Sequence, residues 1–203
     1  MPDSGDDKLK RYREKRDFEK TPEPEGSSGS AGATSGGPVF VIQKHDAQKL
    51  HYDFRLEVDG VLKSWAVPKG PSLDPGDKRL AVATEDHAID YGDFEGVIPE
   101  GEYGAGPVLI WDRGTYENIN EKDDGLRSMT DSLKDGHVLV RLNGEKISGG
   151  YALQRIDDDE DQWLLIKIDD DEADRRRNPT STQPDSVASG RSIEEIAEED
   201  GEA

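Results

Sequence analysis

The stretch Val39-Phe-Val-Ile-Gln-Lys-His-Asp-Ala-Gln-Lys-Leu-His-Tyr-Asp-Phe-Arg-Leu-Glu57 contains two segments in which residues of opposite character alternate. Gln43 and His45 share one parity in the first segment, and the polar residues of the second segment (residues 51–56) alternate with apolar ones. A period of two residues predicts two half-buried β-strands. If the residues between the segments connect them, the strands form an antiparallel hairpin whose polar side chains face one way.

The polar face of this hairpin has the composition of a metal site. A register centred on Gln48 places His45 opposite His51 and Gln43 opposite Asp53, with the β-carbons of each pair about 5 Å apart. Two imidazoles at that separation can bind one ion, and the carboxylate can supply a third ligand, which leaves positions open for water or substrate.

The alternative is that these histidines are ordinary surface or hydrogen-bonded residues, which is the commoner case for a single histidine in a strand. Two of the four histidines of the chain lie within seven residues, however, and Asp53 and Arg55 follow His51 at i+2 and i+4. An arginine beside a metal suits an oxyanion substrate, because its planar guanidinium binds two phosphate oxygens. The combination favours a site.

Composition limits the classes of function. The chain has 203 residues, of which 32% are hydrophobic, enough for one domain with a core and flexible ends. It has no cysteine, which excludes disulfides, zinc–thiolate sites and thiol nucleophiles. The net charge of −20 argues against a broad basic face for nucleic acid and resembles that of proteins from a salt-rich cytoplasm. We expect a cytoplasmic protein, because no apolar run of about 20 residues and no signal-peptide pattern is present.

Three regions follow from the pattern along the chain. Residues 1–37 hold a basic arm, with a short helix expected within residues 8–20, and a flexible Gly/Ser linker at residues 26–37. Residues 38–168 are expected to form the folded domain. Residues 169–203 are acidic and read as a disordered tail.

The folded domain is predicted to be mainly β, as a closed or nearly closed barrel. Asp59-Gly60 is a two-residue turn that favours positive φ, and residues 87–106 suit a long ordered loop with no regular element. One small helix is expected within residues 121–135, around Leu126, Met129 and Leu133. The strands beyond the first hairpin are expected at residues 61–67, 79–84, 107–111, 137–143, 150–156 and 162–168, with a turn at Asp112-Arg-Gly114.

The motifs together resemble the 3′-phosphoesterase module of DNA ligase D, over residues 8–168. They are His45-Asp-Ala-Gln-Lys-Leu-His-Tyr-Asp-Phe-Arg-Leu-Glu57, Ser64-Trp-Ala-Val-Pro-Lys-Gly70, Glu85-Asp-His-Ala-Ile-Asp-Tyr91 and Phe94-Glu-Gly-Val-Ile-Pro-Glu-Gly-Glu-Tyr-Gly104. The resemblance implies a β-barrel with a crescent-shaped cleft and a manganese-dependent activity on 3′ ends. That activity removes a terminal ribonucleoside as a phosphodiesterase and then the 3′-phosphate as a phosphomonoesterase, which prepares ends for nonhomologous end joining.

The resemblance also implies roles for particular residues. The metal ligands are His45, His51 and Asp53; the phosphate is surrounded by Arg55, Arg79 and His87; the pocket is completed by Lys69, Tyr91 and Gln43, and from the arm by Arg16, Asp17 and Glu23. The implied partners are DNA or RNA-tipped DNA 3′ ends at primer–template junctions and the ligase and polymerase of end joining, with no membrane and a monomeric protein. His87 is left with two possible roles, as a phosphate ligand or as the acid that protonates the leaving oxygen.

Two other classes of function fit parts of the pattern. His51-x-Asp53, together with a distant His87 or His137, also matches the pattern of the two-histidine, one-carboxylate triad of non-haem iron oxygenases. That interpretation leaves His45 and the basic cluster unexplained. A module that binds DNA ends without catalysis is the third class.

Overall fold

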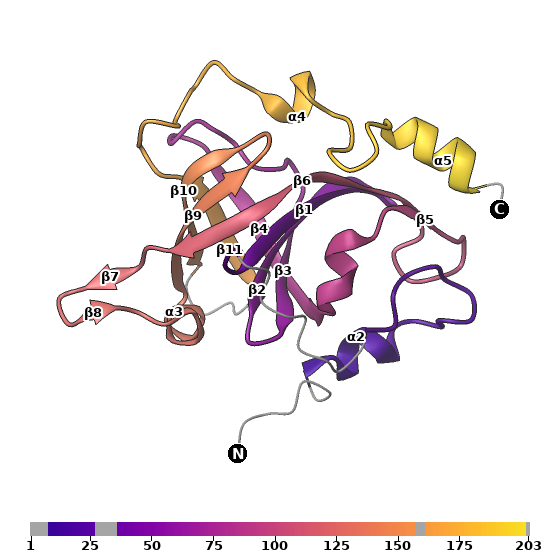
Figure 1. Ribbon diagram of the computed structural model, residues 1–203, viewed down its shortest axis with the longest axis horizontal. Coiled ribbons are helices and arrows are strands. Elements are labelled where there is room, and N and C mark those ends of the chain that lie inside the picture. Colours follow the sequence, from indigo (N-terminus) through magenta and orange to yellow (C-terminus); the bar gives the residue numbers. More distant parts are fainter. Residues whose placement is uncertain (1–7, 27–35, 157–160, 202–203) are drawn as a thin grey trace.

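The computed structural model describes residues 8–26, 36–156 and 161–201 (Figure 1). Most of the Gly/Ser linker predicted at residues 26–37 therefore lies outside the described residues. Within the described part of the chain, no helix has the length and apolar character needed to cross a membrane.

Eight antiparallel strands close into a barrel, as predicted. Closure follows from the pairing of β6 with β1, so the sheet has no free edge at that point. The strands follow one another around the barrel as β1 (Val39–Asp46), β2 (Leu50–Val58), β3 (Val61–Val67), β4 (Lys78–His87), β11 (Gln162–Lys167), β10 (Ser148–Arg155), β9 (His137–Gly144) and β6 (Gly106–Asn118).

The first hairpin has the predicted register. His45 pairs with His51 and Gln43 pairs with Asp53 across β1 and β2. The next turn is also confirmed, because Asp59 has φ 50° and Gly60 has φ 81°, and β3 begins directly after it. These two turns place three consecutive strands of the barrel with their polar face on one side.

Strand β6 is longer than predicted, because it continues through the expected turn at Asp112-Arg-Gly114. The buried carboxylate of Asp112 accepts hydrogen bonds from the backbone N–H groups of residues 145–147, between β9 and β10. A β-carbon at Gly114 would lie 1.9 Å from the carbonyl oxygen of Asn143, so glycine permits the close approach of β9. Both turn-like residues therefore support the sheet.

Residues 87–106 contain regular structure, contrary to the expectation of an irregular loop. They include the 3₁₀ helix η1 (Ile89–Asp93) and the short strand β5 (Gly96–Ile98), which pairs with the start of β6. Hydrophobic burial explains this order, because Tyr91 and Ile98 are almost fully buried.

The helix expected within residues 121–135 is α3 (Met129–Asp135), which begins after the Ser128 cap. The residues before it form a two-stranded hairpin of β7 (Glu121–Lys122) and β8 (Gly125–Leu126). Leu126, which was expected within the helix, lies in this hairpin instead and is 63% exposed.

The arm packs against the outside of the barrel. Tyr12 of its helix α2 (Lys10–Glu14) is completely buried, and Leu9, the residue before the helix, is almost completely buried. Both side chains join a hydrophobic cluster with Val41 of β1 and with Tyr91 and Phe94. The arm is thereby fixed beside the loop that follows β4.

The C-terminal region does not follow the expectation of a disordered tail through residue 201. It contains α4 (Pro179–Thr182) and α5 (Ile193–Gly201), and α5 lies against β5 and β6. Ile193 and Ile196 are buried in the main core, because a spacing of three residues places both on one face of an otherwise acidic helix. Residues 202–203 lie outside the described residues.

Candidate metal centre

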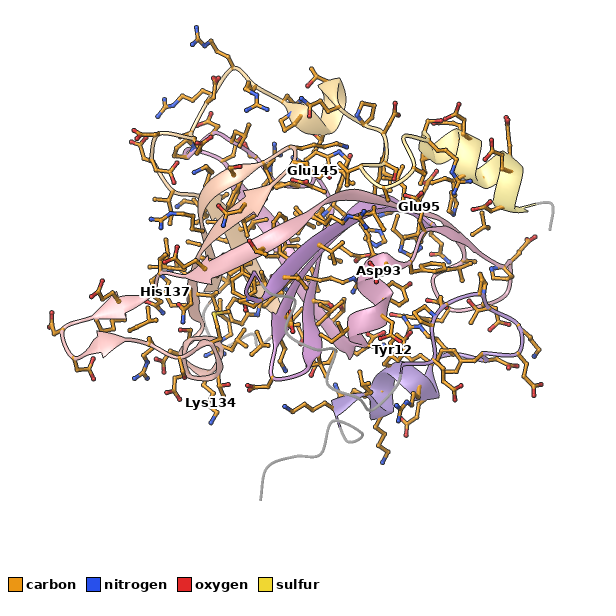
Figure 2. All side chains as sticks on the ribbon, in the orientation of Figure 1. Tyr12, Asp93, Glu95, Lys134, His137 and Glu145 are labelled. Atoms are coloured by element: carbon orange, nitrogen blue, oxygen red, sulfur yellow. The ribbon has the colours of Figure 1, made fainter. Side chains whose placement is uncertain are left out.

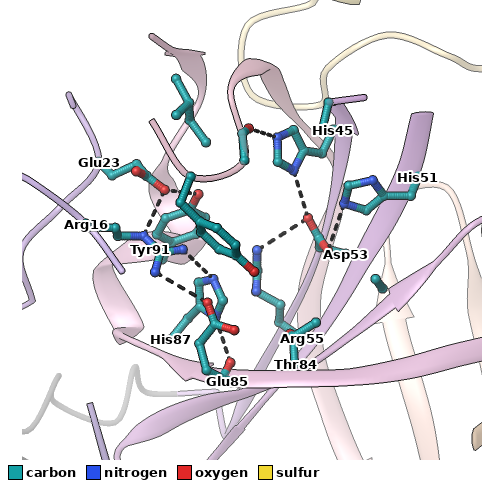
Figure 3. A pocket seen from close by; sticks show the side chains of 15 residues that line it. Arg16, Glu23, His45, His51, Asp53, Arg55, Thr84, Glu85, His87 and Tyr91 are labelled. Atoms are coloured by element: carbon teal, nitrogen blue, oxygen red, sulfur yellow. Dashed lines mark hydrogen bonds and ion pairs between the residues drawn. The ribbon is translucent and has the colours of Figure 1, made fainter. Parts of the chain in front are cut away.

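Asp53 lies between two histidines on the polar face of the first hairpin (Figure 3). One carboxylate oxygen is 3.4 Å from Nδ1 of His45, and the other is 3.3 Å from Nε2 of His51. One ligand atom from each residue lies within 4.8 Å of the others. Among the described residues, these three form the one such group of candidate metal ligands.

The backbone orients both imidazoles. Nε2 of His45 lies 2.6 Å from the carbonyl oxygen of Gly104, and Nδ1 of His51 lies 3.0 Å from that of Lys49. A carbonyl oxygen only accepts, so these nitrogens carry hydrogen, and the other ring nitrogen of each histidine faces Asp53, where it can donate a proton to the carboxylate or, when deprotonated, bind a metal ion. Metal-binding histidines are usually held in this way. The donor set of two nitrogens and an oxygen therefore fits a divalent transition ion.

Neighbouring charges keep Asp53 ionised. Burial raises the pKa of this carboxyl. The guanidinium of Arg55 and hydrogen bonds from the two histidines lower the pKa by more than burial raises it, so the pKa lies well below its usual range. Burial lowers the pKa of His51, and the hydrogen bond and charge of Asp53 outweigh that effect, so that it lies above its usual value. The cluster thus attracts positive charge, whether a proton or a metal ion.

Arg55 is buried beside the carboxylate, with 2% of its surface exposed. Its Nε donates to Gln43 at 2.7 Å, one Nη donates to Ser64 at 2.8 Å, and the other lies 3.5 Å from Asp53. Gln43 donates in turn to the carbonyl oxygens of Tyr91 and Phe94. These contacts use one N–H on each nitrogen and leave a second N–H on each Nη for an anionic ligand.

His87 is neutral and accepts a hydrogen bond from the arm. Its Nδ1 lies 2.9 Å from the carbonyl oxygen of Glu85 and must donate to it, so Nε2 accepts from Arg16 at 3.2 Å. Burial lowers the pKa of His87, and the positive charges of Arg55 and Arg16 lower it further, well below its usual range. In this state Nε2 carries no proton, and the hydrogen on Nδ1 is donated to the carbonyl oxygen of Glu85.

The arm contributes Arg16 and Glu23 to the site but not Asp17. Arg16 pairs with Glu23 at 3.0 Å and with Glu85 at 3.4 Å, and the hydroxyl of Tyr91 donates to Glu23 at 2.7 Å. Asp17 instead pairs with neighbouring Lys20 at 2.9 Å on the surface. Ion pairs thus hold Arg16, Glu23 and Glu85 together at the site.

Lys69 and Arg79 do not lie with the metal cluster. They line a separate cavity of about 360 Å³ together with Lys78 and Asp77. The register explains the separation. Asp53 on β2 pairs with Ala66 on β3, and Ala66 pairs with Val82 on β4. Arg79 therefore lies two strands away from Asp53 and three residues along β4 from the position level with it. Each of these offsets amounts to about 10 Å. His137 lies on β9, away from the arm residue Tyr12 (Figure 2).

The metal cluster opens into a cavity of about 260 Å³. Several of its lining residues were not assigned a role from the sequence. Glu85 lies inside the quoted motif of residues 85–91, two residues before His87, and this position could have indicated that it belongs to the site. Tyr103 and Gly104 likewise lie inside the quoted motif of residues 94–104, whereas Thr84 directly precedes Glu85 on β4 and lies outside the quoted motifs.

The pKa of His87 predicts an acid-dependent loss of stability. Below pH 6.5 the unfolded chain protonates this histidine while the folded protein does not, so the free energy of unfolding falls as pH decreases towards the folded pKa. Thermal unfolding of His87→Gln across pH 7.5 to 5 is expected to show a shallower decrease than the unsubstituted protein. Equal slopes would show that folding does not lower the pKa of His87.

Comparison with known proteins identifies the family of the chain. A family model described as the DNA ligase D 3′-phosphoesterase domain matches residues 43–155, more than half of the chain. The multifunctional non-homologous end joining protein LigD of Pseudomonas aeruginosa is 49% identical over 189 residues, which cover 91% of this chain and 22% of that protein. The multifunctional non-homologous end joining DNA repair protein LigD of Mycobacterium tuberculosis is 49% identical over 162 residues, which cover 80% and 20%.

The chain thus spans about a fifth of the length of these relatives. The match includes the whole hairpin from Gln43, the strand that ends at His87 and the loop that contains Gly104. These are the segments that bring the candidate ligands and the buried arginine together. The chain belongs to the DNA ligase D 3′-phosphoesterase domain family.

Proposed function

We propose that the chain is a metal-dependent phosphoesterase that processes DNA 3′ ends for repair by end joining. The observation that carries the proposal is the convergence of His45, His51 and Asp53 within 4.8 Å, next to the buried guanidinium of Arg55. A cation site beside a fixed guanidinium suits an anionic ester. Family membership supports a phosphate ester at a DNA 3′ end as that substrate.

The residues divide the work by chemistry. His45, His51 and Asp53 would hold a divalent ion, most suitably manganese, which would act as a Lewis acid and lower the pKa of bound water. Arg55 would donate its two remaining Nη hydrogens to phosphate oxygens and stabilise the charge that develops on them. Neutral His87 would position Arg16 towards the phosphate rather than act as an acid.

The remaining assignments follow the family resemblance. Lys69 and Arg79, which line their own cavity, would bind the substrate farther from the metal. The two activities would be removal of a terminal ribonucleoside and removal of a 3′-phosphate, on ends that a ligase and a polymerase then use. The names of the relatives, which are end-joining proteins, support that setting.

Release of phosphate from a primer–template with a 3′-phosphate, and of a nucleoside from one with a 3′-terminal ribonucleotide, tests the proposal. We expect both reactions with added manganese and neither with a chelator. Binding of the DNA with no product under manganese would instead identify a non-catalytic end-binding module. Turnover that requires iron, oxygen and a keto acid would identify an oxygenase, although neither His87 nor His137 belongs to the metal cluster among the described residues.

Arg16 tests the contribution of the arm. Arg16→Gln is expected to lower kcat/KM about tenfold without loss of bound metal, because residues that orient a site typically contribute 10- to 100-fold. Lys10→Gln is the matched control, since it removes the same charge from an exposed position on the same arm. Equal effects of the two variants at matched salt would mean that Arg16 acts only through long-range attraction of DNA.

A further inference from the structure

Tyr103 is an exposed aromatic residue next to the metal centre. Its side chain is one of the few large hydrophobic groups on the described surface, with 48% of its area exposed. It lines the metal cavity and also two neighbouring cavities, one towards Lys15 and the arm and one towards residues 47–49. Tyr103 therefore lies at the junction of three cavities. The function proposed above assigns it no role.

The position of Tyr103 relative to the metal ligands is fixed by its neighbour. The carbonyl oxygen of Gly104 accepts from Nε2 of His45 at 2.6 Å, and Gly104 has φ +76°. A β-carbon at Gly104 would lie 3.2 Å from the imidazole of His45. Because adjacent Cα atoms are about 3.8 Å apart, the backbone that carries Tyr103 is tied to a metal ligand one residue away.

Two cationic side chains of the arm lie over the ring: the guanidinium carbon of Arg16 is 5.5 Å from the ring centroid, and Lys15 is closer. The ammonium of Lys15 lies 4.7 Å from the ring centroid and 3.4 Å from the hydroxyl oxygen, to which it donates. Lys15 is itself held by Glu85, with 3.0 Å between the charged atoms. These contacts give the exposed ring a defined orientation, which reduces the entropy lost when a ligand packs on it.

The ring also borders an open cavity. This cavity of about 840 Å³ is lined by residues 47–49, His51 and residues 100–105, and none of the described arm residues contributes to its wall. It also shares Ala47, His51 and Gly104 with the metal cavity. A group in this larger space can therefore contact the ring while the attached phosphate reaches the metal ligands.

We propose that Tyr103 is a stacking platform for the nucleobase next to the scissile phosphate. The inference rests on the proposed function and identifies a residue that selects nucleotide ends over other phosphate esters. Every base presents a flat π-face, so stacking on an aromatic side chain binds any sequence, at about 1–3 kcal/mol per base. This suits an enzyme that must process ends regardless of sequence.

The test compares two primers with a 3′-phosphate, one whose last nucleotide carries a base and one whose last nucleotide is an abasic analogue. Tyr103→Ala is expected to raise KM about tenfold on the base-bearing primer and to leave KM on the abasic primer unchanged. Tyr103→Phe should retain the KM of the unsubstituted protein, because the ring is kept. Leu126→Ala is the control, as it removes an exposed hydrophobic side chain from the distant β8 hairpin.

A binding measurement separates this inference from the proposed function. 2-Aminopurine at the last position of the primer loses fluorescence when it stacks, and the signal can be read with a chelator present and no turnover. We expect quenching with the unsubstituted protein and Tyr103→Phe, and none with Tyr103→Ala. Equal quenching by all three, or an equal loss of activity of Tyr103→Ala on both primers, would overturn the platform; failure of every protein to release phosphate, with quenching intact, would overturn only the proposed activity.

Discussion

Replacement of Asp53 by asparagine is expected to abolish metal binding and to lower phosphate release about a thousandfold. The carboxylate contacts both histidines and Arg55, and it is the one negative charge in the described metal cluster. Asparagine preserves the size of the side chain but provides a neutral oxygen, so the ion loses its charged ligand. Metal-ion catalysis contributes several kcal/mol, and about 1.4 kcal/mol corresponds to tenfold in rate.

Titration of Mn²⁺ into the metal-free protein, followed by calorimetry or electron paramagnetic resonance, measures the first effect, and 3′-phosphate release measures the second. Asp46→Asn is the matched control, because Asp46 is an exposed carboxylate at the end of β1, the strand that pairs with the strand of Asp53. Thermal unfolding verifies that the variant is folded. Full metal binding by Asp53→Asn would remove this residue from the set of ligands.

Replacement of Arg55 by lysine is expected to lower kcat/KM about a hundredfold while the metal remains bound. Lysine keeps the charge, but a single ammonium cannot contact Gln43, Ser64 and Asp53 and also donate to a phosphate. Loss of one preorganised donor at a developing negative charge typically costs 10²–10³-fold in rate. Stability should also decrease by about 2 kcal/mol, because buried polar partners lose their hydrogen bonds.

Steady-state kinetics and urea unfolding measure these two effects separately. Arg141→Lys is the control, since Arg141 forms an ion pair with Glu117 on the outer surface of β9, where its side chain is 52% exposed. Arg55→Lys with unchanged kcat/KM but reduced stability would assign Arg55 a structural role only. Unchanged values of both would contradict its place beside the phosphate.

Local pattern was sufficient for the fold and for the centre of the site. Alternation along the hairpin predicted its register, and the register alone placed His45, His51 and Asp53 together. Such contacts depend on residues close in sequence, so a pleat of period two and a short connection determine them. The barrel was predictable for the same reason, because its strands are short, alternate in character and are separated by turn residues.

Regions with misleading composition were predicted less well. The acidic C-terminal region reads as disordered, but two isoleucines of α5 are buried in the barrel core. Composition averages over a segment and does not detect two apolar residues on one helical face. The turn-like Asp112-Arg-Gly114 was misread similarly, because its aspartate binds the backbone of a distant turn as well as the N–H of the neighbouring Arg113.

The sequence by itself determined the barrel, the hairpin and the three candidate metal ligands. Only the tertiary structure decided which distant residues join them: Arg16 and Glu23 of the arm enter the site, Asp17 does not, and Lys69 and Arg79 line another cavity. It also decided that the carbonyl of Gly104 orients His45 and that Tyr103 stands beside it. The physical reason is that these contacts join segments tens of residues apart, and closure of the barrel and burial of Tyr12, not any local periodicity, bring them together.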